Sequence, residues 1–334
     1  MVSVGPDSLG EALAVAIGRQ QPANLILASR TEIKVKKVVT KVREETPSLQ
    51  IHVIVLNLAS QKSIKLAASK IQALVDRIDV LINNAGMMTL ERESTEEGIE
   101  IQFGTNHIGH FLFTNLLMTQ LKNAAKASEP GSTRIVNVTS AGHRLSPIRF
   151  HDYNFEGKEV PLDERPPDNL PSMFSSTSNG YNGWLAYGQS KAANILFTVH
   201  LTNSLKSAGI ISYSVHPGSI WTGLSRSLDD IGNETMSKTS NVWKSLDQGA
   251  ATMMVAAFDP ALSGMINQST ALWTISRGLI SVANIEMLAV VSNPSNIYLS
   301  DCQLAQPAPH VLKEETAERL FHLSEELVGM KFYL

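Results

Sequence analysis

The stretch Tyr187-Gly188-Gln189-Ser190-Lys191 is the part of the sequence on which the interpretation of the whole chain depends. A tyrosine and a lysine four residues apart share one face of a helix, which places an ammonium group beside a phenol. A free phenol has a pKa of about 10, and a nearby positive charge favours the phenolate and lowers that pKa. Such a pair is a general acid/base suited to interconverting a carbonyl and an alcohol. Any surface helix can carry this spacing by chance, so support must come from the rest of the chain.

Outward from this stretch, short apolar runs alternate with longer stretches of helical periodicity. The predicted strands are Asn24–Ala28, Ile51–Leu56, Val80–Ile82, Arg134–Val138 and Ile211–Val215, and the predicted helices are Leu9–Arg19, Glu32–Glu45, Gln61–Arg77, Thr95–Lys122 and Ala186–Ala208. Continuous apolar strands separated by helices are typical of a parallel sheet covered on both faces. We therefore expect an α/β fold with a doubly wound, Rossmann-type sheet, a single domain over residues 1–334, and a ligand beyond the carboxyl ends of the strands.

Composition narrows the classes of function. The 334 residues are 43% apolar and 18% charged, and a net charge of −3 gives no reason to expect nucleic acid or an anionic membrane as partner. Cys302 is the only cysteine, so an internal disulfide is excluded. No signal peptide is recognised at the N-terminus, and charged and polar residues interrupt the apolar segment Ala271–Val291. We expect a cytoplasmic protein with no membrane span and no metal site.

Polar residues follow the predicted strands at the edge where a ligand would bind. Ser29 and Arg30 follow the first of these strands, and a hydroxyl and a guanidinium there suit a phosphate, whereas an acidic residue would suit a ribose diol. This favours NADP over NAD, although an arginine can also simply end a strand. Asn57 follows the second strand and Asn83-Asn84-Ala85-Gly86 the third, where such residues allow a tight turn and close approach of the backbone to a ligand.

Two residues run against the helical pattern between Thr95 and Lys122. Asn106 and Gly109 lie in mid-helix, where they cost roughly 0.7 and 1 kcal/mol relative to alanine. One explanation is a side chain or carbonyl turned toward a site at a helix kink, and the other is close helix–helix packing at Gly109. His107 and His110 are interpreted as packing residues, because no cysteine or carboxylate lies near them in sequence.

The later strands are also followed by hydroxyl groups and turns. Ser140 follows the fourth strand, and Pro217-Gly218-Ser219-Ile220-Trp221-Thr222 follows the fifth. Between Ser140 and Tyr187 lies a segment rich in Pro, Ser and Asn, at about residues 146–183, which we expect to form a loop that shapes a pocket near the site.

The motifs quoted above, taken in their order along the chain, resemble those of the short-chain dehydrogenase/reductase family over essentially the whole chain. The residues that carry the resemblance to its retinol-dehydrogenase-like branch, as used by many fungal reductases, are Asn106-His107-Ile108-Gly109-His110-Phe111, Ala186–Lys191 and Tyr298-Leu299-Ser300-Asp301-Cys302. The resemblance implies that Tyr187 exchanges a proton with the substrate oxygen and that Lys191 lowers its pKa and holds the nicotinamide ribose. Ser140 would hydrogen-bond the substrate oxygen, and Asn106 would hold a water that links Lys191 to solvent.

The resemblance also implies a cofactor site for NADP(H). Asn83 to Gly86 would line the adenosine side, and Thr222 would bind the nicotinamide carboxamide. The full set of expected cofactor residues is Ser8, Leu9, Gly10, Ser29, Arg30, Asn57, Asn83, Ala85, Gly86, Tyr187, Lys191, Pro217, Gly218, Ile220 and Thr222.

Three departures from the family pattern concern the cofactor site and the sheet. The family opens with a strand and Thr-Gly-x-x-x-Gly-x-Gly, whereas Ser3–Gly10 keeps only the last glycine, and the first strand is reduced to a stub or missing. Asn57 replaces the usual aspartate that contacts adenine, with a modest effect expected. Residues 264–296 have no counterpart in the family, and two hypotheses account for them: a retained intron, paired with a missed first exon, or a genuine insertion that forms a substrate lid.

The leading hypothesis is an NADP(H)-dependent oxidoreductase that interconverts a ketone and a secondary alcohol on an apolar small molecule. A role in fungal secondary metabolism, and a homodimer or homotetramer, are implied only by the resemblance. The rival hypothesis is a binding or scaffold protein that keeps the fold but has lost firm dinucleotide binding. The retained catalytic side chains favour the first, and the incomplete glycine loop favours the second.

Overall fold

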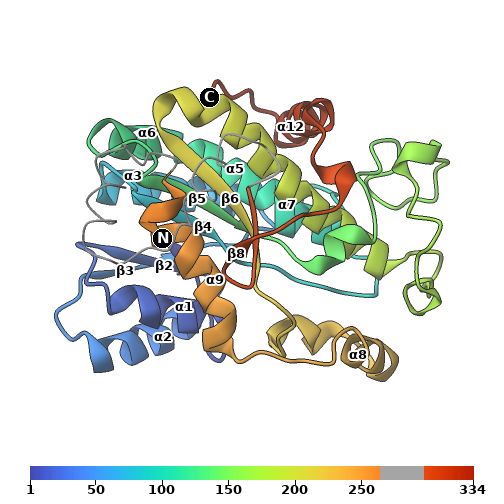
Figure 1. The fold of residues 1–334 in the computed structure, drawn as a ribbon, viewed down its shortest axis with the longest axis horizontal. Helices are drawn as coiled ribbons and strands as arrows, with labels where there is room; N and C mark the ends of the chain where they lie inside the picture. The colour runs from blue at the N-terminus through green and yellow to red at the C-terminus, as the bar shows by residue number, and fades with distance from the viewer. Residues whose placement is uncertain (264–296) are drawn as a thin grey trace, which may run out of the picture.

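The computed structural model describes residues 1–263 and 297–334 and has one mixed sheet between two layers of helices (Figure 1). The sheet order is β3-β2-β1-β4-β5-β6-β7-β8, parallel throughout except for the antiparallel pair β7–β8. The strands are β1 (Val2–Ser3), β2 (Leu25–Ser29), β3 (Ile51–Val55), β4 (Val80–Asn83), β5 (Thr133–Val138), β6 (Ile210–His216), β7 (Tyr298–Ser300) and β8 (Gln303–Leu304). This is the expected doubly wound α/β fold. The hypotheses on residues 264–296 lie outside the described residues.

The first strand is present as a stub. β1 pairs in parallel with β2 on one side and β4 on the other. The backbone N–H of Val4 donates to the carbonyl of Ala28 at 2.8 Å, and the N–H of Ile82 donates to the carbonyl of Met1 at 2.9 Å. The neighbouring strands therefore do not face a gap at the centre of the sheet, and of the two expectations, stub or missing, the stub is correct.

Helices cover both faces of the sheet, each with an apolar stripe against it. One face carries α1 (Leu9–Gly18), α2 (Glu32–Glu45) and α9 (Leu246–Phe258). The other carries α3 (Gln61–Leu74), α5 (Gly109–Leu116), α6 (Met118–Lys126), α7 (Gly183–Leu205) and α12 (Glu314–Val328). In α7, nineteen residues of twenty-three are buried, so this helix is buried on most of its circumference rather than along a single stripe. No helix within the described ranges is both long and apolar enough to cross a membrane.

The helix predicted from Thr95 begins later and changes its geometry. Residues before Ile101 form a turn in which the N–H of Thr95 donates to the carbonyl of Ile99 at 2.8 Å. α4 (Ile101–Phe103) is followed by the π-helix η1 (Gly104–Ile108) and then by α5. Asn106 therefore lies in a π-helical segment rather than in a regular α-helix. Such π-helical turns often occur at functional sites.

Gly109 serves close packing, although its partner is a loop rather than a helix. A Cβ atom at Gly109 would overlap the backbone carbonyl of Leu58, in the loop after β3. His107 and His110 are buried, and Nε2 of His107 contacts the Ser324 hydroxyl of α12 at 2.8 Å. Within the described residues no cluster of side chains suits a metal ion.

Other elements connect the layers and shape the edge where the strands end. They include η2 (Ala141–Arg144), η3 (Leu162–Glu164), η4 (Ser172–Phe174), η5 (Lys206–Ala208), η6 (Gly223–Ser227), α8 (Asp230–Ser237), η7 (Pro260–Leu262) and η10 (Pro309–Val311). α7 begins at Gly183 rather than Ala186, because the side chain of Asn182 caps it by accepting from the N–H of Leu185 at 3.0 Å.

Candidate active site

A large cavity lies at the carboxyl ends of the strands, with a volume of about 1050 Å³. Its lining comes from the loops after β1, β2, β4, β5 and β6, from α7 and from the segment before α7. This is where ligands bind in doubly wound sheets, and the volume is at the upper end for ligand pockets. The cavity can therefore hold a dinucleotide together with a small molecule.

Three of the four predicted catalytic residues line this cavity: Ser140, Tyr187 and Lys191. Ser140 extends from the end of β5, and its hydroxyl hydrogen-bonds with the Tyr187 phenol. The ammonium of Lys191 lies 5.6 Å from the centre of the Tyr187 ring and donates to the backbone carbonyl of Val138 at 3.2 Å. The helix and the strand end that were recognised separately in the sequence thus meet at one point.

The protonation states differ from the expectation at the tyrosine. Burial raises the pKa of Tyr187 to about 12, and the hydrogen bond with Ser140 opposes this only in part. Burial also lowers the pKa of Lys191 to about 8. The expected lowering of the tyrosine pKa by Lys191 is therefore wrong for this arrangement, because the removal of the phenol from water dominates. At neutral pH the site holds a neutral phenol beside a mainly cationic lysine.

Asn106, the fourth predicted catalytic residue, lies behind the cavity wall. It is fully buried, and its side chain accepts from the N–H of Met87 at 2.8 Å and donates to the carbonyl of Met87 at 2.9 Å. It also donates to the hydroxyl of Ser190 on α7 at 2.9 Å. The amide therefore fixes the loop after β4 against the helix that carries Tyr187. Gly86 lies in this loop, and a Cβ atom there would come within 3.2 Å of the Lys191 ammonium.

The predicted cofactor residues divide into two groups. Those that line the cavity are Ser8, Leu9, Gly10, Ser29, Arg30, Ala85, Gly86, Tyr187, Lys191, Pro217, Gly218, Ile220 and Thr222. Asn57 and Asn83 do not line it. The side-chain oxygen of Asn57 accepts from the N–H of Ala59 at 3.2 Å, so it closes its own turn. Asn83 is buried within the fold and donates to Asn137 at 2.8 Å, while the neighbouring Asn84 takes the place at the cavity wall.

The incomplete glycine loop leads into the capped N-terminus of α1. Ser8 is the N-cap of this helix: its hydroxyl accepts from the N–H of Glu11 at 3.3 Å and donates to the carbonyl of Gly5 at 2.6 Å. Asp7 takes the left-handed conformation, with φ of 51°, that a glycine would adopt most easily. Ser3 through Gly10 line the cavity, so the N-terminus of α1 opens toward it. The hydroxyl of Ser3 is buried without a partner among the described residues.

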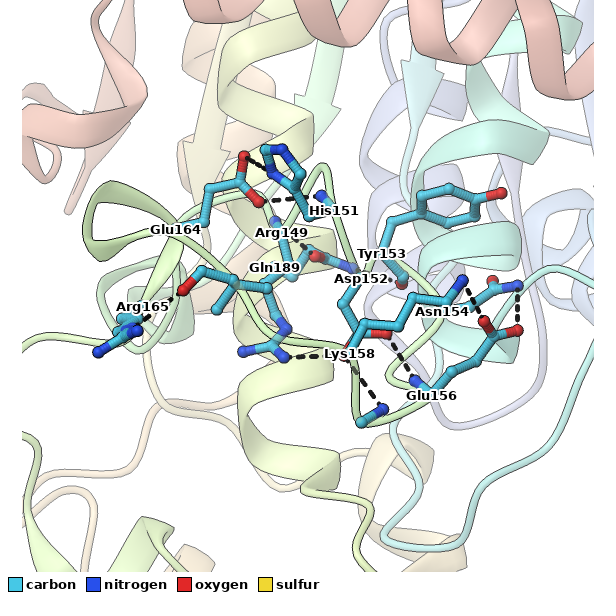
Figure 2. Close-up of polar contacts among 12 residues, drawn as sticks. Arg149, His151, Asp152, Tyr153, Asn154, Glu156, Lys158, Glu164, Arg165 and Gln189 are labelled. Atoms are coloured by element: carbon cyan, nitrogen blue, oxygen red, sulfur yellow. Dashed lines mark hydrogen bonds and ion pairs between the residues drawn. The ribbon is translucent and has the colours of Figure 1, made fainter.

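The predicted loop at 146–183 is attached directly to the catalytic helix (Figure 2). Gln189 is fully buried, two residues after Tyr187 on α7. Its side chain accepts from the backbone N–H of Arg149 at 2.9 Å and donates to the carbonyl of Tyr153 at 3.0 Å. The first half of the loop is thereby fixed to α7, and residues of its second half, Pro167 to Phe174, line the cavity.

Sequence reasoning missed the apolar wall of the cavity and one cation. Met88 and Trp184 line the cavity, and both are buried in one cluster with Tyr187. Trp184 could have been found, because it precedes Tyr187 by three residues and so shares its helix face. Lys34 lies four residues after Arg30, in the first turn of α2, and also lines the cavity. It could have been found as Arg30 was, from its position shortly after the end of β2.

A half-buried serine beside a buried tyrosine and a buried lysine, at the strand ends of a doubly wound sheet, defines an oxidoreductase of the Rossmann class. The family model described as short chain dehydrogenase matches residues 2–154. Human retinol dehydrogenase 13 is 33% identical over 97% of this chain and 82% of its own length. The chain belongs to the short-chain dehydrogenase family, in its retinol-dehydrogenase-like branch.

Two further similarities agree with this assignment. The oxidoreductase fscI of Fusarium equiseti is 37% identical over 64% of this chain and 83% of its own length. A crystal structure of an uncharacterised protein from Mycobacterium paratuberculosis has a TM-score of 0.62 at 26% identity, covering 100% of this chain and 94% of that one. The family and the enzyme class are thus confirmed.

Proposed function

We propose that this protein is an NADP(H)-dependent oxidoreductase that interconverts a ketone and a secondary alcohol on an apolar small molecule. The observation that carries the proposal is that Ser140, Tyr187 and Lys191 line the same cavity as Arg30, which follows β2, three strands away from β5 in the sheet. NADPH, when bound, supplies the hydride for reduction. A role in fungal secondary metabolism and a homodimer or homotetramer remain predictions from the family resemblance.

The residues of this chain fit such a cofactor. The N-terminus of α1 suits the pyrophosphate, and Arg30 and Lys34 suit a ribose phosphate. Lys191 and Thr222 would hold the nicotinamide end. The roles of Asn57 and Asn83 as direct cofactor contacts are not part of the proposal, since neither reaches the cavity.

In the reducing direction, the phenol of Tyr187 donates its proton to the substrate oxygen as that oxygen gains negative charge. The hydroxyl of Ser140 donates a hydrogen bond to the same oxygen, and the cation of Lys191 stabilises the phenolate that forms. The neutral state of Tyr187 at pH 7 is the reactive state for reduction. The buried Met88 and Trp184 beside the phenol support an apolar substrate.

Arg30→Ala is expected to weaken NADPH binding roughly 10- to 100-fold, because a hydrogen bond to a charged group contributes about 1.5–3 kcal/mol. NADH binding should stay within about twofold, since NADH lacks the phosphate that Arg30 would contact. Fluorescence titration of the purified variant with each nucleotide measures both effects. Arg43→Ala, an exposed change on α2 outside the cavity, is the matched control. An equal loss for both nucleotides would contradict the assignment of Arg30 to the phosphate.

The pH dependence of reduction should follow Lys191. Its pKa of about 8 leaves it cationic at pH 7 and neutral well above pH 8, while Tyr187, with a pKa of about 12, stays protonated. We expect kcat/KM for NADPH-dependent reduction of phenanthrenequinone, a bulky apolar diketone, to be flat up to about pH 7.5 and then to fall. Lys191→Arg keeps the charge and should move any remaining descending limb to higher pH. A plateau that extends beyond about pH 9.5 in the unmodified protein would contradict this role of the cation.

A further inference from the structure

We propose that His143 is a positioning residue for the catalytic Ser140, and that the chain segment after β8 sets the tautomer in which it acts. This inference rests on the proposed function and adds to the site a residue that does not touch the substrate. His143 is fully buried in η2, three residues after Ser140. It does not line the cavity, so an effect on catalysis would have to pass through its neighbours.

The carbonyl of Ser140 is held twice by His143. The backbone N–H of His143 donates to it at 3.1 Å, and Nδ1 of the imidazole contacts it at 2.6 Å. A carbonyl oxygen only accepts, so Nδ1 must carry a proton. These bonds fix the peptide plane after Ser140, whose hydroxyl accepts from the N–H of Gly142 at 3.1 Å and hydrogen-bonds with Tyr187.

The other imidazole nitrogen is fixed by the C-terminal segment. The backbone N–H of Ala308 donates to Nε2 of His143 at 2.9 Å, so Nε2 must be unprotonated. Only one neutral tautomer satisfies both partners. Burial lowers the pKa of His143 to about 3, in keeping with a neutral ring, and the ring packs edge-on against Tyr298 of β7 with the ring centres 5.5 Å apart.

The same segment makes two more contacts with η2. The guanidinium of Arg144 donates to the carbonyl of Gln306 at 2.7 Å, and Nε2 of His310 donates to the carbonyl of His143 at 3.0 Å. The chain between β8 and α12 is therefore bound along the turn that carries the catalytic serine (Figure 1). A displacement of this turn would move the Ser140 hydroxyl relative to Tyr187.

Two near-isosteric substitutions separate the two functions of the ring. Asn places its amide nitrogen near the position of Nδ1, so His143→Asn can keep the bond to the Ser140 carbonyl and loses the bond to Ala308. Gln places a polar atom near the position of Nε2, so His143→Gln can keep the bond to Ala308 and loses the bond to Ser140. A residue that only stabilises the fold would give similar activity losses for both variants.

The experiment measures kcat for NADPH-dependent reduction of phenanthrenequinone, together with NADPH affinity and thermal unfolding. We expect kcat to fall roughly 100-fold in His143→Gln and by less than about threefold in His143→Asn, with NADPH affinity unchanged in both, because small misplacements of reacting groups carry large rate costs. In a Ser140→Ala background, His143→Gln should lower the residual kcat no further. Equal losses of kcat in His143→Gln and His143→Asn would overturn the proposal. So would a roughly 100-fold loss of kcat when His143→Gln is added to Ser140→Ala.

The tautomer of His143 can also be measured in the unmodified protein. This measurement does not require the variants to fold or to be active. In ¹⁵N-histidine NMR spectra between about pH 6 and 9, the buried ring should stay in the Nδ1-protonated neutral form, since its pKa lies far below this range. The signal is assigned by its loss in His143→Asn. An Nε2-protonated or titrating ring would refute the inference about His143. Absence of any phenanthrenequinone turnover with a correct tautomer would instead count against the proposed function.

Discussion

Tyr187→Phe is expected to reduce kcat roughly a thousandfold while leaving the Kd for NADPH within about twofold, since a positioned general acid contributes about 10²–10⁴ in rate. The substitution removes only the phenolic oxygen. The ring keeps its place against Gly142, where a Cβ atom would come within 3.0 Å of it, so the pocket changes little in shape. The loss should therefore appear in kcat rather than in cofactor binding.

The matched control is Tyr153→Phe, which makes the same chemical change in the loop that is attached to Gln189, outside the cavity. It should retain kcat within about twofold, because Tyr153 makes its hydrogen bond to Gln189 through its backbone carbonyl. Steady-state NADPH consumption with phenanthrenequinone measures both variants. Turnover that survives Tyr187→Phe would remove this residue from its role as proton donor.

Gly10→Ala is expected to abolish detectable NADPH binding and to destabilise the fold by about 1–3 kcal/mol. A Cβ atom at Gly10 would lie far closer to the backbone carbonyl of Ser3 than any real Cβ atom approaches, and 3.0 Å from Nδ2 of Asn84. The backbone carbonyl of Ser3 cannot move away easily, so α1 must shift from β1. Its N-terminus would then no longer face the pyrophosphate position.

Gly5→Ala is the control in the same loop. A Cβ atom at Gly5 would meet no atom of the protein within 4 Å, so this variant should keep the free energy of unfolding of the unmodified protein. Chemical denaturation measures the free energy of unfolding, and fluorescence titration measures binding. If Gly10→Ala binds NADPH as well as Gly5→Ala does, the loop Ser3–Gly10 does not contact the cofactor.

The fold could be predicted largely because its strands are buried on both faces. β2 and β5 are buried along almost their whole length, and Ser29 at the end of β2 and Ser140 two residues after β5 mark the binding edge. Helix ends were less predictable. The turn before Ile101 is held by backbone hydrogen bonds and by a glycine at φ of 77°, Gly98, and no apolar period marks where it stops.

The sequence predicts most of the cavity-lining residues that lie directly after a strand. Asn57 and Asn83 show the limit of that reasoning, because a strand end indicates the edge of the sheet but not the direction of a side chain. Asn57 turns back on its own loop, and Asn83 turns into the core toward Asn137. The role proposed for His143 depends on a contact with Ala308, 165 residues away, which no local pattern indicates.

The pKa of Tyr187 illustrates a second limit. Spacing alone placed a cation beside the phenol and indicated a lowered pKa, but the sequence does not report the depth of burial. In the folded protein, burial dominates and raises the pKa to about 12. At neutral pH the phenol of Tyr187 therefore carries its proton.

The rival hypothesis of a binding or scaffold protein depends on the glycine loop. β1 is only Val2–Ser3, yet it is paired on both sides, and the loop that follows still lines the cavity. The predicted catalytic residues Ser140, Tyr187 and Lys191 line the same cavity. A protein that only binds a partner as a scaffold would not need this grouping. The two hypotheses therefore differ most in whether the chain binds a dinucleotide.

Titration of the purified protein with NADPH, followed by nucleotide fluorescence, tests the central claim most directly. We predict saturable binding at one site per chain, with NADH binding at least roughly tenfold more weakly because it lacks the phosphate facing Arg30. Absence of saturable NADPH binding by the folded protein would contradict the proposal that this chain is a working dehydrogenase.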